Sequence, residues 1–532
     1  MRWLFEHLFG ARLEAETAAY IKKIANQRAA ASHERASSLV KTLAAGDGPM
    51  LSMGRADWGG DVAMPVPEFM RSHALVSGGS GSGKTTFAGD KERSLLGLFP
   101  HTRGVGLGLL DGKKELFDAT LFLIGLRLVE LGRAAARDLR RRIEVVDFSS
   151  RDPISPYNIL ARWPGADPEF FAQSRADLLL ELLPGSDGVS LGGSGLLRRA
   201  ILLLSEFSLP ITWLDVLLHD EQFRGRLLAR SQNTGVAKYF AQQFPTLPKQ
   251  TVAALSRRVE ALFASETVRL ALSGTSAPDF RALQDEGKIV IENSFGKDIS
   301  RSVRQLLQAI ILSDVAHATF ARRHHDTAFL WIADEAQNFF LTQHLRDHMM
   351  DLLTMARSFG THFMLISQNM TTALQDARVL SVLHTNIRWA FAMRGEPGDC
   401  SFLRAALPVT GRRRKPQTSP FEEPGLYSVN EERAMVLDEI ANLPDRVGYL
   451  WLKSRSPEAV RITVPTLSVP RGSELEAAIG PLRNDPTFGA RLSRREHEQR
   501  IAARDREWLS GSEGNLDATL AGAYRRVREG DA

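Results

Sequence analysis

Two adjacent acids at the end of an apolar run raise the first chemical question. The stretch AFLWIADEAQNFF, residues 328–340, begins with six apolar residues that are typical of a buried strand and continues with Asp334 and Glu335. Carboxylates beside a buried strand are costly to desolvate unless a cation meets them. Capping of the following helix is the alternative use for both acids.

A glycine-rich stretch supplies the partner. HALVSGGSGSGKTTF contains Gly78-x-x-x-x-Gly83-Lys84-Thr85, the spacing of the phosphate-binding P-loop. Its glycines let the backbone curl and point N–H groups at phosphate oxygens, and the N-terminus of the following helix attracts the same anion. A merely glycine-rich turn is the alternative, but here an apolar strand precedes the pattern and a helix follows it. The residues expected to bind the nucleotide are Gly78, Gly79, Ser80, Gly81, Ser82, Gly83, Lys84, Thr85 and Thr86.

The P-loop pattern assigns a role to each acid. In P-loop nucleotidases, the Ser or Thr of the loop and an acid at the end of a neighbouring strand hold magnesium. Thr85 and Asp334 are therefore the expected metal ligands, while Lys84 would meet the β- and γ-phosphates. Glu335 is the expected catalytic base, because it can polarise the water that attacks the γ-phosphate. The acid pair thus favours hydrolysis of ATP with Mg²⁺ over simple nucleotide binding.

A repeated pattern of strands and helices must position these residues. Short apolar runs end in polar residues and are followed by helix-length segments, which is typical of an α/β fold with a mostly parallel sheet covered on both faces. Ligands bind beyond the carboxyl ends of such strands, where the glycines and the acids lie. The expected strands are residues 73–77, 104–111, 142–147, 287–293, 328–334, 362–367, 387–393 and 446–452.

Composition places the chain in a reducing, aqueous compartment. There are 67 Lys and Arg against 62 Asp and Glu, a mild excess that permits a polyanionic partner without requiring one. The single cysteine, Cys400, excludes an intrachain disulfide. No signal peptide or transmembrane span is evident, since charges and Pro210 interrupt the apolar run 201–218. We expect a cytoplasmic protein. The bulky apolar residues near the start of segment 1–45 predict a helix that packs on its own domain or a neighbouring subunit, or lies peripherally on the inner membrane.

Several sequence blocks resemble those of a known family. The chain is similar to the HerA–FtsK superfamily of ring-forming DNA pumps and, within it, to the type IV secretion coupling proteins of bacterial conjugation, in a soluble form. The ordered series DEAQNF, ARSFG and SQN is the most specific part of the likeness. The blocks are GGSGSGKTT (78–86), DGKKEL (111–116), SPYNIL (155–160), GKIVIEN (287–293), WIADEAQNF (331–339), ARSFGTHFMLISQN (356–369) and LDEIANLP (437–444).

The resemblance implies a ring and assigns two further residues. It implies a RecA-like motor domain and a homo-hexamer that binds nucleotide between subunits and DNA in its central pore. Gln368 would sense the γ-phosphate, with an ordinary strand-end residue as the alternative. Arg357 would reach as a finger into the next subunit's site. Arg388 and Arg394 compete for that role, and a surface helix arginine is the plain alternative.

The same resemblance gives a domain layout. We expect an N-terminal helical region at 1–66 and a discontinuous RecA-like P-loop ATPase domain at 67–160 and 285–470. Leu-rich segments between them predict an all-helical insertion at 161–284, and residues 471–532 predict a charged, solvated helical tail.

The leading functional prediction is an ATPase that pumps DNA. Sequence-independent phosphate contacts would come from basic clusters such as 411–415 or, less favoured because it is expected to cover a helix face, 133–142. A secretion-channel, relaxase or nuclease partner is compatible with this class. The alternatives are a secretion or pilus-assembly ATPase that does not move DNA, a HerA-like DNA-processing or defence helicase, and a slow nucleotide switch, against which Glu335 argues.

Overall fold

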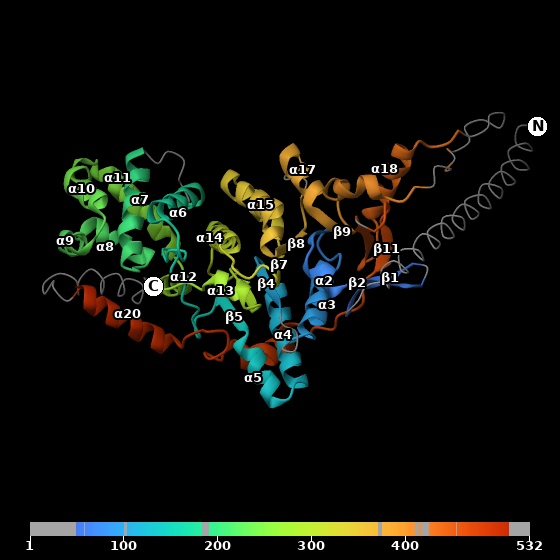
Figure 1. The fold of residues 1–532 in the computed structure, drawn as a ribbon, viewed down its shortest axis with the longest axis horizontal. Coiled ribbons are helices and arrows are strands. Elements are labelled where there is room, and N and C mark those ends of the chain that lie inside the picture. Colours follow the sequence, from blue (N-terminus) through green and yellow to red (C-terminus); the bar gives the residue numbers. More distant parts are fainter. Residues whose placement is uncertain are drawn as a thin grey trace, which may run out of the picture. The chain divides into compact units, whose positions relative to one another are not determined.

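The computed structural model describes residues 49–57, 59–99, 104–183, 191–370, 375–409, 413, 415, 425–453 and 455–509. The chain divides into two compact units, each assembled from segments that are distant in the sequence (Figure 1). Unit 1 comprises Met1–Thr102, Ala328–Leu341 and Met349–Val469, and unit 2 comprises Arg103–Thr327, Thr342–His348 and Pro470–Ala532. The P-loop pattern and the acid pair therefore belong to the same unit.

Unit 1 is built on a mixed sheet. Its strands lie in the order β2-β1-β11-β10-β9-β3-β8-β7, in which β9, β3, β8 and β7 are parallel and the remaining pairs are antiparallel. The strands are β1 (Met50–Ala56), β2 (Asp61–Pro65), β3 (His73–Ser77), β7 (Ala328–Ala333), β8 (Thr361–Ser367), β9 (Ile387–Met393), β10 (Val447–Leu452) and β11 (Val460–Thr463). The helices are α2 (Val66–Met70), α3 (Lys84–Leu96), η4 (Ala336–Phe340), η5 (Ala356–Phe359), α17 (Ala377–Asn386), η6 (Pro397–Ala406) and α18 (Val429–Ile440), and α15 (Gln343–Met355) has residues in both units.

The middle of this sheet is its most buried part. Every residue of β3, β7 and β8 is buried, as a strand covered on both faces requires. The aromatic rings of Phe69 and Trp389 stack at 5.3 Å between centroids, and Phe87 contacts Trp389 edge-on, so α2 and α3 are anchored to β9. Strand β3, which leads into the P-loop, is thereby held between β8 and β9.

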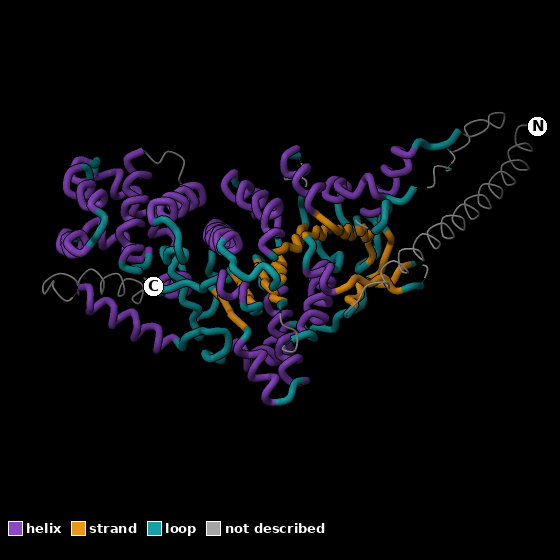
Figure 2. The backbone as a smooth tube through the Cα atoms, viewed as in Figure 1, coloured by secondary structure: helices purple, strands orange, loops and turns teal. Residues whose placement is uncertain are grey.

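Unit 2 contains a smaller parallel sheet and most of the helices. Its strands lie in the order β4-β6-β5 and are all parallel. Figure 2 shows the helices between β5 and β6, which form a group without strands among the residues that the structure describes. The strands are β4 (Val105–Asp111), β5 (Ile143–Asp147) and β6 (Ile289–Asn293). The helices are α4 (Glu115–Glu130), α5 (Arg133–Arg141), α6 (Pro168–Leu182), α7 (Leu191–Glu206), η1 (Ile211–Trp213), α8 (Leu214–His219), α9 (Glu221–Arg230), α10 (Thr234–Gln242), η2 (Phe244–Thr246), α11 (Lys249–Glu260), η3 (Ala261–Phe263), α12 (Glu266–Leu272), α13 (Phe280–Asp285), α14 (Arg301–Phe320), α19 (Gly472–Arg483) and α20 (Arg494–Leu509).

The predicted fold class is confirmed, and all eight expected strands are present. They correspond to β3 to β10, each within two residues of its expected ends. The expected boundaries differ from the two compact units, because the segments on either side of the helical insertion fold together with it in unit 2. No single helix among the described residues has the length and apolarity needed to cross a membrane. Helix α7 followed by residues 211–219 meets both criteria only as a pair bent by 118°.

The expectation of a helical region at 1–66 is wrong for residues 50–65. These residues form β1 and β2, and β1 continues the sheet beside β11. Gly54 has φ +144° at the register shift between the two strands, and a Cβ there would lie 2.7 Å from the Thr463 carbonyl oxygen. Gly54 is therefore explained by a β-bulge at which the backbones of β1 and β11 approach closely. The helix expected over 1–45 lies outside the described residues.

The helices α19 and α20 agree with the expected helical tail, but the expectation that the tail is solvated is wrong for several residues up to 509. Arg491, His497 and Arg504 are all buried. The guanidinium of Arg491 donates to the carbonyl oxygen of Leu482 at 2.8 Å, and that of Arg504 donates to the carbonyl oxygen of Ser273 at 2.8 Å. Backbone carbonyls satisfy these two guanidinium groups. Part of this charge-rich segment therefore packs against the rest of unit 2.

Candidate nucleotide-binding site

The glycine-rich stretch forms a loop between β3 and α3, as its pattern predicts. Helix α3 begins at Lys84, and Gly83 before it has φ +104°, a conformation that side chains with a Cβ rarely adopt. A Cβ on Gly83 would lie 2.9 Å from Cγ of Arg446, and one on Gly78 would lie 2.7 Å from Oγ of Ser82. Gly83 is therefore favoured by its backbone conformation as well as by the space around it, and Gly78 by the space alone.

The loop presents several donors at one place. The Lys84 ammonium is buried and donates to the carbonyl oxygens of Gly78 and Gly79, at 2.5 and 2.8 Å. Among the residues that the structure describes, the buried Ser82 hydroxyl has no hydrogen-bond partner. Thr85 and Thr86 lie half-buried in the first turn of α3, where backbone N–H groups lack partners within the helix. A cation, a hydroxyl and helix N–H groups at one glycine loop match the needs of a polyphosphate.

The acid pair lies at the carboxyl end of β7, in the same unit. Asp334 is 8% exposed, and its Oδ1 accepts a hydrogen bond of 3.0 Å from the backbone N–H of Glu335. Glu335 has φ +54°, a left-handed conformation that costs a residue with a Cβ roughly 1–2 kcal/mol. The backbone between the two carboxylates is therefore held in a conformation that glutamate disfavours.

A chain of hydrogen bonds connects the loop with the second acid. The N–H of Gly78 donates to the carbonyl oxygen of Ser367 at 3.2 Å, where β8 ends beside β3. The Ser367 hydroxyl donates to Oε1 of Gln337 at 2.7 Å, and Nε2 of Gln337 donates to Oε2 of Glu335 at 2.5 Å. Strand β8 lies between β3 and β7, so these contacts bridge the gap that one intervening strand leaves. The structure thus brings the two predicted motifs together at the carboxyl ends of neighbouring strands in one sheet.

Sequence reasoning gave no role to Gln337 or Ser367. Both residues stand inside blocks that supported the family resemblance, WIADEAQNF and ARSFGTHFMLISQN. The signal that points to them is their placement immediately after the acids and at the end of a buried strand. The amide of Gln337 offers one acceptor and two donors, which suits a bridge between a hydroxyl and a carboxylate.

The oxygen ligands at these strand ends fit a magnesium ion. Thr85 offers a hydroxyl oxygen and Asp334 a buried carboxylate, and Mg²⁺ prefers oxygen ligands of this kind. One protein hydroxyl and one carboxylate leave the remaining coordination positions to phosphates and water, which is the usual arrangement for this ion. Thr85 and Asp334 would therefore hold it.

The two residues expected from the family resemblance lie at opposite ends of β8. Gln368 follows the last residue of the strand and is half-buried at the P-loop edge. Arg357 precedes the strand, in η5, and is exposed. Seven residues of strand span about 20 Å, so Arg357 does not reach the P-loop of its own chain. It acts instead on His73 at the start of β3, where burial, and then the charge of Arg357, lower the pKa of the imidazole to about 3.

The competing arginines are also separated by the structure. Arg388 is the second residue of β9 and is exposed at the same end of the sheet as Arg357. Arg394 follows the last residue of β9 and lies against the P-loop of its own chain.

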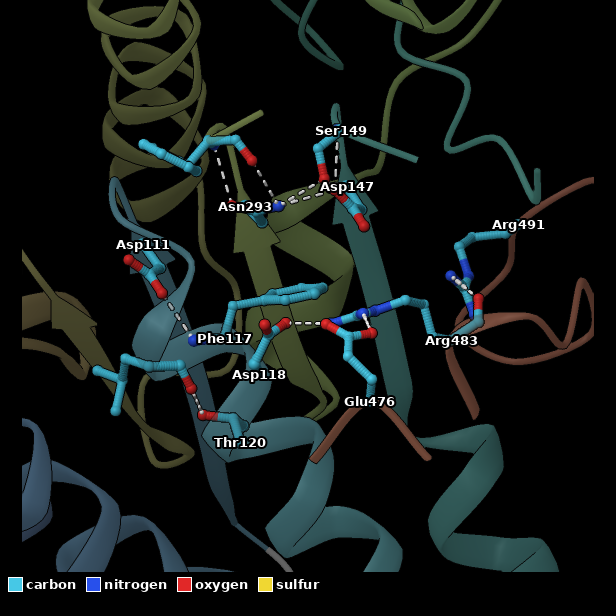
Figure 3. Close-up of polar contacts among 12 residues, drawn as sticks. Asp111, Phe117, Asp118, Thr120, Asp147, Ser149, Asn293, Glu476, Arg483 and Arg491 are labelled. Atoms are coloured by element: carbon cyan, nitrogen blue, oxygen red, sulfur yellow. Dashed lines mark hydrogen bonds and ion pairs between the residues drawn. The ribbon is translucent and has the colours of Figure 1, made fainter. Parts of the chain in front are cut away.

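Polar residues at the strand ends of unit 2 are satisfied by one another (Figure 3). Asp111, which opens the DGKKEL block, accepts hydrogen bonds from the N–H groups of Lys113 and Phe117, both at 2.7 Å, and so holds the start of α4. Asn293 donates to Asp147 at 2.9 Å. In the same view Arg483 pairs with Asp118 and Glu476. The contacts of Asp111, Asn293 and Asp147 fix the ends of β4, β6 and β5, and the Arg483–Asp118 pair joins α19 to α4, so these are structural roles.

The SPYNIL block is likewise structural. The Tyr157 hydroxyl donates to Asp314 of α14 at 2.5 Å, and Trp163 donates to the same carboxylate at 2.6 Å. Arg175 of α6 forms a buried ion pair with it. Burial first, and then the neighbouring Asp314 carboxylate, raise the pKa of Tyr157 well above its usual value. One carboxylate therefore ties the helical insertion to α14.

The basic clusters are only partly described. Within 411–415, the structure describes Arg413 and Lys415, and each pairs with an acid of α18: Arg413 with Glu439 at 3.8 Å and Lys415 with Glu431 at 3.0 Å. The other residues of that cluster lie outside the described part. The arginines of 133–142 lie on α5 and the turn after it, as expected for a helix face.

Solved structures share this fold. No protein-family model matches the sequence, and no curated protein matches it either. The chain is similar to the plasmid coupling protein TrwB in complex with the non-hydrolysable ATP analogue ADPNP, with 16% identity over 80% of this chain and 90% of that chain and a TM-score of 0.50. It is also similar to VirB4 of Thermoanaerobacter pseudethanolicus, with 11% identity over 80% of this chain, 98% of that chain and a TM-score of 0.49.

The likeness to TrwB establishes the fold. This chain has a RecA-like P-loop ATPase fold, shared with a conjugative coupling protein over most of the length of both. The resemblance inferred from the sequence blocks is thereby confirmed at the level of the fold.

Proposed function

We propose that this chain is an ATP-hydrolysing DNA translocase of the conjugative coupling-protein type, within the HerA–FtsK superfamily. The observation that carries the proposal is the hydrogen-bond chain from Gly78 through Ser367 and Gln337 to Glu335. It connects the glycine loop with Glu335 at the carboxyl ends of β3, β8 and β7, which supports a site in which the loop would bind phosphate and Glu335 would act on the attacking water. The fold shared with TrwB, whose structure contains ADPNP, supports the same conclusion.

ATP is the proposed substrate, and its hydrolysis requires little covalent chemistry from the protein. Lys84 would stabilise the charge on the β- and γ-phosphates, and Glu335 would orient the attacking water and accept its proton. Thr85 and Asp334 would hold Mg²⁺, which when bound neutralises phosphate charge. Gln368, which follows the carboxyl end of β8, would contact the γ-phosphate and so sense whether it is present.

A ring completes the proposed site. Arg357 is exposed at the end of β8 that is remote from its own P-loop, so a role in hydrolysis requires another copy of the chain. We propose a homo-hexamer in which Arg357 stabilises the phosphoryl oxygens bound by its neighbour. DNA in the pore would be gripped through its phosphates, and a channel protein, relaxase or nuclease would be the partner in the cytoplasm.

Stimulation by DNA tests the motor. Phosphate release is measured with the purified chain at saturating ATP and Mg²⁺, alone and with single- or double-stranded DNA of unrelated sequences. A translocase predicts a several-fold increase that does not depend on sequence and that falls as salt rises. A rate that DNA leaves unchanged would contradict the motor and favour an ATPase that serves secretion or pilus assembly.

Mixed rings test the arginine. An Arg357→Ala chain and a Lys84→Ala chain are each expected to be nearly inactive, because one lacks the finger and the other lacks phosphate binding. Mixing them places an intact Arg357 beside an intact P-loop at some interfaces, so activity is expected to recover in part. Arg388→Ala, at the same end of the sheet, is the matched comparison. If ATPase activity recovers in mixed rings with Arg388→Ala but not with Arg357→Ala, Arg388 would be the arginine finger.

A further inference from the structure

Arg394 lies against the P-loop of its own chain. Its carbonyl oxygen accepts a hydrogen bond of 2.6 Å from the N–H of Gly79. Its guanidinium reaches the tip of the loop, since a Cβ built on Gly81 would lie 3.6 Å from Nη2 of Arg394. A cation therefore stands beside the exposed part of the loop in addition to the buried Lys84.

The segment that carries Arg394 is fixed to the loop. A Cβ on Gly395 would lie 3.0 Å from the backbone nitrogen of Gly79, so glycine favours this close approach. Farther along the same segment, the Ser77 hydroxyl donates to the carbonyl oxygen of Asp399 at 3.1 Å. The backbone at Arg394 is thus held in place, while its side chain is 37% exposed.

One carboxylate holds that side chain. Nη1 of Arg394 lies 2.7 Å from Oδ1 of Asp445, whose side chain is 63% exposed. The next residue, Arg446, has φ +66° and donates its N–H to the carbonyl oxygen of Ser82 at 2.8 Å. Both partners of the ion pair therefore stand on segments that are bonded to the P-loop, one to each side of its tip.

We propose that Arg394 binds the phosphates of the nucleotide in the same subunit, and that Asp445 is a competing anion from which it must be released. This inference rests on the proposed function. A guanidinium forms strong, paired hydrogen bonds with phosphate as well as with carboxylate, so the two anions compete for one fork. The exchange needs only rotation of an exposed side chain over a fixed backbone. Asp445 then lowers nucleotide affinity, and Arg394 raises it.

Opposite effects of the two partners test the proposal. Binding of fluorescent mant-ATP and mant-ADP with Mg²⁺ is titrated for the full chain and for Arg394→Ala, Asp445→Asn and the double variant. Loss of a charge-assisted phosphate contact predicts about 10-fold weaker binding for Arg394→Ala. Release of Arg394 predicts several-fold tighter binding for Asp445→Asn, and the double variant is expected to bind like Arg394→Ala. Arg394→Lys keeps the charge but not the fork and should fall between wild type and Arg394→Ala.

A second arginine–aspartate pair of the same unit is the control. Arg461 and Asp57 are also 2.7 Å apart and are 39% and 46% exposed, but they lie on β11 and just after β1, and β10 and β9 separate these strands from β3 and its P-loop. Arg461→Ala and Asp57→Asn should leave mant-ATP binding unchanged, and thermal unfolding checks that every variant is folded.

The outcomes separate the inference from the proposed function. Equal weakening by Arg394→Ala and Asp445→Asn would show that the pair only supports the loop, and would overturn the inference. Unchanged binding in Arg394→Ala would overturn it too. In both cases wild-type binding, and its loss in Lys84→Ala, would leave the proposed function standing. Failure of the wild-type chain to bind either nucleotide would overturn the proposed function together with the inference.

Discussion

Replacement of Gln337 by methionine tests the bridge between the P-loop and the second acid. Methionine keeps the length of the side chain but removes both hydrogen bonds, the one accepted from Ser367 at 2.7 Å and the one donated to Glu335 at 2.5 Å. A hydrogen bond to a charged group contributes about 1.5–3 kcal/mol. If that energy orients Glu335 in the transition state, its loss lowers kcat by about 10- to 150-fold.

The left-handed turn at Glu335 explains why the effect should fall on kcat. A backbone at φ +54° is unfavourable for glutamate, and the contact with Gln337 is one of those that hold it there. Lys84 and the glycine loop do not depend on that contact, so nucleotide affinity should change little.

Phosphate release and mant-ATP titration measure the two quantities separately. Gln343→Met is the matched control, because it makes the same chemical change at an exposed residue whose side-chain amide donates to Asp347 at 2.8 Å. A kcat within twofold of wild type would show that Gln337 does not orient Glu335 for hydrolysis. A loss of affinity as large as the loss of kcat would refute it as well, because the loop itself would then be damaged.

Three further predictions concern the loop, a buried acid and the cysteine. Gly83→Ala should weaken mant-ATP binding by about 5- to 30-fold, since the left-handed backbone alone costs about 1–2 kcal/mol, whereas Gly225→Ala, in a helix and in open space, should not. Burial raises the pKa of Glu144 to about 7, above its unfolded value of 4.5, so its ionisation costs stability that is recovered as pH falls below 7. Glu144→Gln should therefore increase the free energy of unfolding by about 2 kcal/mol more at pH 8.5 than at pH 5, measured by urea denaturation; an equal effect at both pH values would contradict this. Burial also raises the pKa of Cys400 to about 12, so this thiol should react with a disulfide reagent at pH 8 only after denaturation, and rapid reaction of the folded chain would argue against its burial.

Local patterns were sufficient for the parallel strands and the P-loop. Buried parallel strands are nearly continuous apolar runs, so each can be recognised alone, and the P-loop is one uninterrupted spacing of glycines, Lys84 and Thr85. The register Ser77 to Ser367 could not be read from either strand, although it aligns the two ends on which the site is built.

Contacts between distant segments account for what the sequence did not reveal. Gln337 is an ordinary polar residue until Ser367 faces it, and Arg394 is an ordinary loop arginine until Gly79 bonds to its carbonyl oxygen. The strands β1 and β2 were missed because Gly54 interrupts their alternation at a bulge. The tail was expected in solvent because composition does not show that backbone carbonyls satisfy Arg491 and Arg504.

Two substitutions separate nucleotide binding from hydrolysis, one in the glycine loop and one in the acid pair. Wild type, Lys84→Ala and Glu335→Gln are compared for mant-ATP binding and for phosphate release under the same conditions. We expect Glu335→Gln to bind ATP as tightly as wild type but to release phosphate at least about 100-fold more slowly, because the base is lost and the loop is intact. We expect Lys84→Ala to lose binding. Wild-type rates of phosphate release in Glu335→Gln would show that this acid pair and this glycine loop do not form one hydrolytic site.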